Sequence, residues 1–195
     1  NITVIAKDAV DNPSIPISTT IAYQPTTVLS IDITSPPEGA RRVNTPTITV
    51  SGTVSDSTAT VTVKSLPAQV VGNTFTANNI PLTAGTNTIT ARAVKGTSNV
   101  TDTINVILDQ DPPSISIYTP DANATTRSNI VYGKVSDDIQ SVTVNGTAAE
   151  ILSDFRFIAR PTLTEGTNTI TVQAQDQAAN TNQASVNITY NTQTP

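Results

Sequence analysis

The sequence repeats itself at a spacing of 81 residues. Residues 82–90 read Leu-Thr-Ala-Gly-Thr-Asn-Thr-Ile-Thr and residues 163–171 read Leu-Thr-Glu-Gly-Thr-Asn-Thr-Ile-Thr, so eight of nine positions are identical. Other pairs keep the same spacing, among them Gly52 with Gly133 and Val61 with Val142. An internal repeat means that this chain of 195 residues is built from small units and not from one large domain. The fold must be one that roughly 80 residues can complete.

Apolar and polar residues alternate within each repeat. Val61 and Val63 in the first repeat correspond to Val142 and Val144 in the second. A period of two is typical of strands with one buried face. Such runs are separated by Gly, Asn and Pro at intervals of roughly 8–12 residues, which indicates an all-β chain of antiparallel sandwiches.

Three segments follow from aligning the repeats. Residues 26–110 form one full repeat (repeat one) and residues 111–195 form another (repeat two). Residues 2–8, Ile-Thr-Val-Ile-Ala-Lys-Asp, are similar to residues 170–176, Ile-Thr-Val-Gln-Ala-Gln-Asp. We therefore expect residues 1–25 to be the last two strands of a preceding, truncated repeat, and the chain to be a piece of a longer protein. Pro residues at the boundaries interrupt strand pairing and favour stiff junctions.

Two kinds of turn are expected. Gly85 and Gly166 each precede the strongest strand of their repeat, where a turn with positive φ suits Gly. Asn145-Gly146 predicts a tight hairpin turn of the primed type. Repeat one has Ser65 nearby in place of an Asn-Gly pair, so its hairpin is expected to differ.

Composition excludes several functions. The chain has no His and no Cys, so it lacks the commonest general base and all thiolate chemistry. Its few Glu residues fall in predicted loops, and we predict that it is not an enzyme. The net charge is −5 with 13% charged residues, which argues against nucleic acid and anionic membrane surfaces as partners. We expect no membrane insertion, since no apolar run approaches about 18 residues.

The run from Leu163 to Asn180 carries a family resemblance. It reads Leu-x-x-Gly-Thr-Asn-Thr-Ile-Thr-Val-x-Ala-x-Asp-x-x-x-Asn and resembles bacterial immunoglobulin-like repeats, in particular those like the B-type domain of glucodextranase. Gly-x-Val-Ser-Asp at 52–56 and 133–137 fits the same pattern. The resemblance covers essentially the whole chain and implies tandem immunoglobulin-like antiparallel β-sandwiches. It implies little about function, because such modules occur in adhesins, secreted hydrolases and surface-layer proteins.

Calcium is the ligand that the acidic residues favour. Asp109 and Asp111 lie two residues apart at the junction of the repeats, and Asp137 and Asp138 are expected at the same pole. Carboxylate and carbonyl oxygens suit this ion, so we predict a calcium site at these four residues. The alternative is a solvated turn before Pro. For Asp176, and for the acidic residues of the first hairpin, the favoured interpretation is hydrogen bonding to the local backbone.

The sequence leaves three functions open. The leading hypothesis is a non-enzymatic spacer of a bacterial secreted or cell-surface protein, in a stalk or adhesin-type array whose partners are neighbouring repeats. The first alternative is a filament subunit that self-associates by strand addition through residues 1–25. The second is a carbohydrate-associated accessory module of a secreted glycosidase, although Tyr118 and Tyr190 are expected to pack between domains. All three predict an extracellular location.

Overall fold

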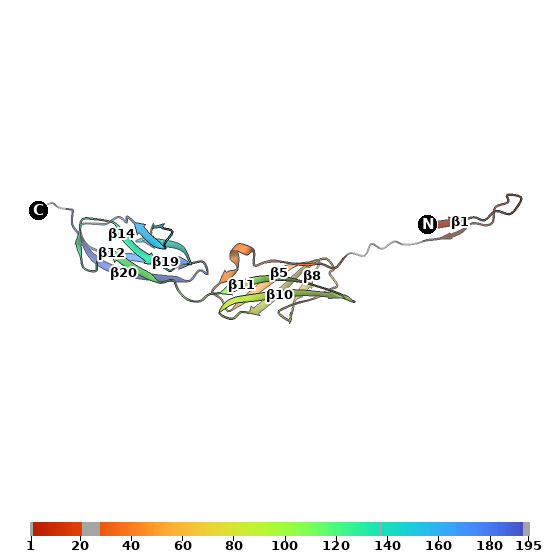
Figure 1. The fold of residues 1–195 in the computed structure, drawn as a ribbon, viewed down its shortest axis with the longest axis horizontal. Helices are drawn as coiled ribbons and strands as arrows, with labels where there is room; N and C mark the ends of the chain where they lie inside the picture. Colours follow the sequence, from red (N-terminus) through yellow and green to blue (C-terminus); the bar gives the residue numbers. More distant parts are fainter. Residues whose placement is uncertain (1, 21–27, 137, 193–195) are drawn as a thin grey trace.

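The computed structural model describes residues 2–20, 28–136 and 138–192. Two β-sandwiches lie end to end, and an N-terminal hairpin is set apart from them (Figure 1). One short 3-10 helix, η1 (Glu38–Ala40), accompanies the strands. Among the described residues, no helix is long and apolar enough to cross a bilayer.

Repeat one is a sandwich of two sheets. The first has the strand order β3-β5-β9-β8 and the second the order β4-β11-β10-β6-β7. The strands of the first sheet are β3 (Ile31–Ser35), β5 (Thr47–Val54), β9 (Thr74–Pro81) and β8 (Gln69–Val71). Those of the second are β4 (Arg42–Val43), β11 (Ser98–Leu108), β10 (Gly85–Lys95), β6 (Thr60–Val63) and β7 (Leu66–Pro67).

Repeat two has the same topology, strand for strand. Its sheets have the orders β12-β14-β18-β17 and β13-β20-β19-β15-β16. The first contains β12 (Ile115–Thr119), β14 (Val131–Val135), β18 (Arg156–Ala159) and β17 (Glu150–Ile151). The second contains β13 (Thr125–Thr126), β20 (Thr181–Tyr190), β19 (Gly166–Asp176), β15 (Ile139–Val144) and β16 (Thr147–Ala148). This arrangement confirms tandem all-β sandwiches.

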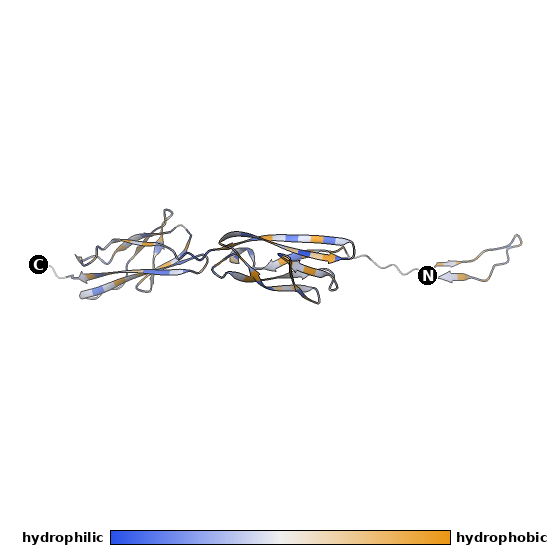
Figure 2. Ribbon diagram, turned by 90° about the horizontal axis from the view of Figure 1, so that it is seen from below, coloured by the Kyte–Doolittle hydropathy of each residue, from blue (hydrophilic) through white to orange (hydrophobic). Residues whose placement is uncertain are grey.

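Each repeat has its own apolar core. The two cores are separate clusters of Val, Ile, Leu, Ala and one Phe, and the bands along the strands in Figure 2 show the alternation that fills them. Phe75 and Phe157 are fully buried at equivalent positions. Each ring lies over a glycine: a Cβ on Gly133 would be 2.6 Å from the Phe157 ring and 2.2 Å from the Ser116 carbonyl oxygen. Packing therefore explains why Gly52 and Gly133 recur.

The repeated Gly-Thr-Asn motif forms a loop that is closed by hydrogen bonds between its own Asn side chain and the backbone. Gly85 and Gly166 have φ values of +85° and +95°, which confirms the predicted turn conformation. The Asn87 side chain accepts a hydrogen bond from the Thr83 amide at 2.9 Å and donates to the Thr83 carbonyl at 2.7 Å. Asn168 makes the same bonds with the backbone of residue 164. The motif thus serves the loop that leads into β10 and β19.

The β6–β7 hairpin departs from the prediction. Lys64 and Ser65 have φ values of 47° and 68°, close to the 47° and 79° of Asn145 and Gly146. The two hairpins are therefore alike, and the expected difference is wrong. The physical reason is that a two-residue hairpin matches the twist of its strands only when both turn residues have positive φ. Strand pairing imposes this conformation on residues that do not prefer it.

The N-terminal segment is a hairpin without a sandwich. β1 (Ile2–Val4) pairs antiparallel with β2 (Ile17–Thr19), and an isolated bridge joins Lys7 to Pro13. Both strands are exposed along their length. The prediction that residues 1–25 belong to a preceding repeat remains a prediction, and its residues 1 and 21–25 lie outside the described part of the chain.

Candidate functional site

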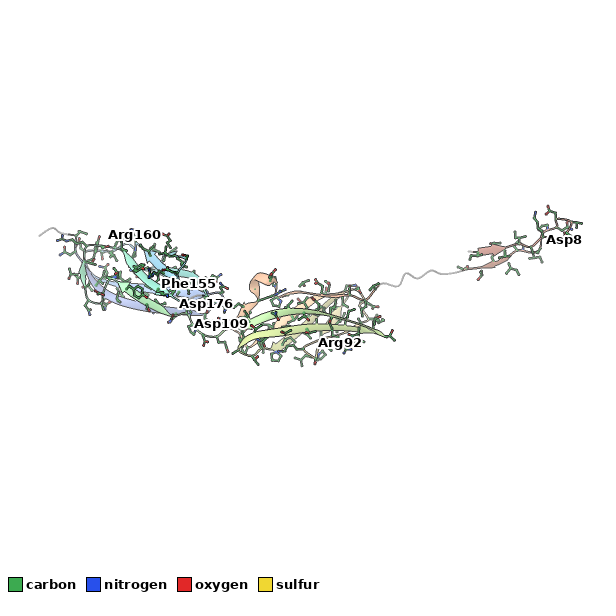
Figure 3. The ribbon with its side chains drawn as sticks, in the orientation of Figure 1. Asp8, Arg92, Asp109, Phe155, Arg160 and Asp176 are labelled. Atoms are coloured by element: carbon green, nitrogen blue, oxygen red, sulfur yellow. The ribbon has the colours of Figure 1, made fainter. Side chains whose placement is uncertain are left out.

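Three aspartates gather where the repeats meet. Asp109 follows β11 of repeat one, Asp138 precedes β15, and Asp176 ends β19 of repeat two. Each contributes a carboxylate oxygen to a set that lies within 4.8 Å, and Figure 3 labels Asp109 and Asp176 side by side. The ends of three strands thus create a concentrated negative charge at the junction, which we call the junction cluster (Asp109, Asp138, Asp176).

Arg42 neutralises part of this charge from β4. Its Nη1 lies 2.9 Å from Asp109 Oδ2 and 3.6 Å from Asp138 Oδ2. Because Asp109 belongs to repeat one and Asp138 to repeat two, the guanidinium bridges the domains. The three side chains are 15–31% exposed, so solvent screens these pairs only in part. This geometry makes Arg42 an interdomain contact.

The Asp176 turn supplies a second contact across the junction. Asp176 is fully buried, and its carboxylate accepts hydrogen bonds from the Asn180 amide at 2.8 Å and from Asn180 Nδ2 at 2.9 Å. The same Nδ2 donates to the Asp109 carbonyl oxygen at 2.9 Å. One Asn side chain therefore closes its own turn and binds the end of the preceding repeat. The predicted turn chemistry for Asp176 is confirmed, with an interdomain role added.

The cluster divides its charge unequally. Burial disfavours ionisation of Asp109, but hydrogen bonds from the Asp111 amide and the Arg42 guanidinium outweigh it and lower the pKa of Asp109. The pKa of Asp138 is raised, first by burial and then by the neighbouring Asp109 and Asp176 carboxylates. Asp109 is thus the preferred partner of Arg42, and Asp138 keeps its proton to a higher pH than Asp109 does.

Of the four residues predicted to bind calcium, the structure brings two into the cluster. Asp109 and Asp138 belong to it, whereas Asp111 only lines the adjoining groove of about 540 Å³ and donates its amide to Asp109 Oδ1 at 3.2 Å. Asp137 lies outside the described residues. Sequence reasoning missed Arg42 altogether, because β4 is only two residues long and has no apolar periodicity.

The donor set is compatible with calcium, but other groups already contact it. Three clustered carboxylates offer the oxygen ligands that Ca²⁺ uses. However, Arg42 lies against Asp109 and Asp138, and Asn180 donates to the Asp176 carboxylate. An ion bound to all three carboxylates would have to displace the guanidinium. Calcium therefore stays a prediction from the sequence.

A second group of side chains distinguishes repeat two. The rings of Tyr118 and Tyr132 lie 5.8 Å apart, and the Arg156 guanidinium is 6.0 Å from the Tyr132 ring centre. Tyr118 is 48% exposed. Tyr118 packs on Tyr132 within its own repeat and lies near the end of β12 remote from the junction, so it takes no part in the contact between repeats one and two. An exposed aromatic and cationic face results.

Comparison with known proteins agrees with the fold. The family described as "Glucodextranase, domain B" matches twice, over residues 29–110 and 113–192. Bacillopeptidase F of Bacillus subtilis is 35% identical over 160 residues, which cover 76% of this chain and 11% of that protein. The chain therefore spans only a small part of this relative.

Among solved structures, the fibronectin(III)-like modules of Clostridium thermocellum CbhA align with a TM-score of 0.55 and 18% identity, covering 83% of this chain and 94% of theirs. A three-domain immunoglobulin fragment of titin aligns with a TM-score of 0.48 and 12% identity, covering 76% of this chain and 61% of the fragment.

Proposed function

Starting from the glucodextranase domain B family, to which this chain belongs, we propose that it is a non-catalytic spacer in a bacterial secreted or cell-surface protein. Its immediate partners are neighbouring repeats of the same protein. Each sandwich is a link of fixed length, and the junction sets the angle between links. The similarity to Bacillopeptidase F supports an extracellular location and an accessory place beside another domain.

The observation that carries this proposal is the contact set across the junction. Asn180 Nδ2 binds the Asp109 carbonyl at 2.9 Å, and Arg42 lies between Asp109 and Asp138. The linker itself contains Pro112 and Pro113, which restrict their own and preceding backbone angles. A flexible tether would need none of these contacts. Two links joined in this way keep a set direction and hold whatever follows at a set distance.

Small-angle scattering of the full chain tests the spacer role. The expected result is a scattering profile of an elongated particle in which the two sandwiches, within residues 28–192, keep one relative orientation. Spin-label distances between the repeats give the same information without the contribution of the N-terminal hairpin. A broad distribution, as for two domains tumbling independently, would overturn the proposal. The comparison should be repeated with calcium and then with chelator.

The calcium prediction has a separate test. In a calorimetric titration, calcium is added to the protein and the heat of binding is measured. Heat is expected only if the ion displaces Arg42 from Asp109 and Asp138. An Arg42→Gln variant should then bind more tightly than the natural sequence, because the competing cation is gone. If neither protein bound calcium, the calcium prediction would be wrong, and Arg42 would be the cation that neutralises the junction cluster.

A carbohydrate-associated role is a second candidate. The exposed Tyr118 ring and the half-buried Tyr132 ring next to Arg156 favour it, because aromatic faces stack on sugars and a guanidinium donates to hydroxyl groups. The glucodextranase family name points in the same direction. Retention on starch or dextran that is lost in Tyr118→Ser would support this role. Lack of retention would exclude the carbohydrate-associated role and leave the spacer role as the proposed function.

A further inference from the structure

The N-terminal hairpin exposes an apolar face. Ile2 and Val4 are 51% and 64% exposed, and Ile17 is 75% exposed. A two-stranded hairpin is marginally stable at best in water. Burial of these side chains by a partner would remove apolar surface from water and stabilise the hairpin.

The turn of the N-terminal hairpin has the same hydrogen bonds as the Asp176 turn of repeat two. Asp8 Oδ1 accepts a hydrogen bond from the Asn12 amide at 2.9 Å, and Asp8 Oδ2 accepts one from Asn12 Nδ2 at 3.1 Å. The equivalent bonds between Asp176 and Asn180 measure 2.8 and 2.9 Å. The two turns are therefore the same structural element.

The backbone continues the equivalence. Asp11 has a φ of 70° and Ala179 a φ of 67°, each directly before the Asn. The bridge between residues 7 and 13 corresponds to the pairing of residues 175 and 181. Counted from this turn, Ile2 and Val4 of β1 align with Ile170 and Val172. Beyond the bridge β2 is shifted by one residue relative to β20, since Val4 pairs with Ile17 whereas the register of β19 and β20 would pair it with Pro16. In repeat two the Ile170 and Val172 side chains are fully buried beneath the facing sheet.

We propose that residues 2–20 bind as the last two strands of a further sandwich of this family, distinct from repeats one and two. In repeat two, β19 lies between β15 and β20, and β13 flanks β20. The partner is therefore a sandwich that presents an open position between those two strand equivalents and an uncovered apolar core. This inference concerns the hairpin alone and does not depend on the spacer role.

A second copy of the chain offers no such position. In repeat one the equivalent pair, β10 and β11, is flanked by β6 and β4, and in repeat two β15 and β13 flank the pair. Both sandwiches already hold their own last two strands. By analogy with Asn180, Asn12 would then bind a backbone carbonyl at the end of the repeat before its own sandwich.

The test supplies the missing strands in one polypeptide. Residues 112–168 are fused ahead of Asn1 of the full chain, so that Asn1 takes the place of Thr169 and Ile2 that of Ile170. Hydrogen–deuterium exchange followed by mass spectrometry then reads residues 2–19, with repeats one and two as internal references. The matched control is the same fusion with Val4→Asp, which puts a charge at a buried position.

Protection in the fusion is the expected result. Amide exchange within residues 2–19 should slow by at least about 100-fold relative to the unfused chain, as expected for strands of a cooperative core, and Val4→Asp should abolish the effect. Fast exchange in both proteins would overturn the proposal. Protection already present in the unfused chain, together with a concentration-dependent dimer in sedimentation velocity, would assign the hairpin to a second copy and overturn it as well.

Discussion

Replacing Arg42 with Gln should loosen the angle between the two repeats without unfolding either. Arg42 lies at the rim of repeat one, on a two-residue strand, and contributes no side chain to the apolar core. Its guanidinium contacts one carboxylate from each repeat. Removing the positive charge leaves Asp109 and Asp138 facing each other with no cation between them. The junction then loses an attraction and gains a repulsion.

The magnitude follows from the distances. At 2.9 Å and an effective dielectric constant of about 20, the attraction between Arg42 and Asp109 is about 6 kcal/mol before desolvation. Desolvation and side-chain entropy offset most of this value, and partly exposed pairs contribute roughly 0.2–1 kcal/mol. A hydrogen bond to a charged group contributes somewhat more. We therefore expect a loss of about 1–2 kcal/mol, which lowers the ratio of docked to undocked junctions by about 5–30-fold.

Spin-label distance measurements can detect this change directly. The chain contains no Cys, so the substitutions Thr53→Cys and Gln173→Cys introduce one label in each repeat at exposed strand positions. The natural junction should give one narrow distance distribution, and Arg42→Gln should broaden it. Arg92→Gln is the matched control, since Arg92 donates to Asn99 at 2.8 Å within repeat one.

An unchanged distribution in Arg42→Gln would refute the reasoning. It would mean that the Pro-containing linker and the Asn180 contact hold the junction by themselves. Broadening in Arg92→Gln to the same extent would refute it differently, because the effect would then not come from the junction. Arg42→Lys should fall between the two, since it keeps the charge and loses the planar geometry of the guanidinium.

Three further predictions test the packing, the turn and the charge of the cluster. Gly133→Ala should destabilise repeat two by about 3 kcal/mol or more, since the new Cβ would lie 2.2 Å from a backbone oxygen; thermal unfolding should show repeat one unaffected. Asn180→Ala should cost about 1–3 kcal/mol in denaturant unfolding, because buried Asp176 loses a donor. Asp138→Asn should stabilise the chain at pH 7 and not at pH 3. The reason is that the raised pKa of Asp138 favours the folded state while the carboxyl is protonated, and this stability is lost as pH rises above the ordinary value of 3.8. Equal unfolding midpoints for Asp138→Asn and the natural chain at both pH values would contradict the last prediction.

The fold could be predicted because its signals are local and repeated. Alternation in Val61 and Val63 and in their counterparts marks strands, and the Gly-Thr-Asn run marks the same loop twice. The β6–β7 turn could not be predicted, since Lys64 and Ser65 do not prefer positive φ. Their conformation follows from the pairing of the strands on either side.

The junction cluster could be predicted only in part. Asp109 and Asp138 were expected at one pole because strand ends of a sandwich meet there. Asp176 has a complete local explanation in its turn, so nothing in the sequence signals that Asn180 of this turn also binds the Asp109 carbonyl oxygen. Arg42 reaches the cluster because β4 pairs in parallel with the end of β11. The residue opposite Arg42 is Ile107, which lies 65 residues later in the chain. Long-range pairing of two residues leaves no periodic signal.

The repeats share the backbone of the junction but not its chemistry. The Asp109 amide donates to the Val43 carbonyl at 2.9 Å, and the equivalent Asn191 amide donates to the Thr126 carbonyl at 3.0 Å. By the same register, Thr125 stands in repeat two where Arg42 stands in repeat one. The fold thus maintains this strand end without needing the Arg–Asp pair. It follows that the Arg42–Asp109 pair belongs to the boundary between repeats one and two, because the equivalent positions of repeat two, Thr125 and Asn191, carry no charge.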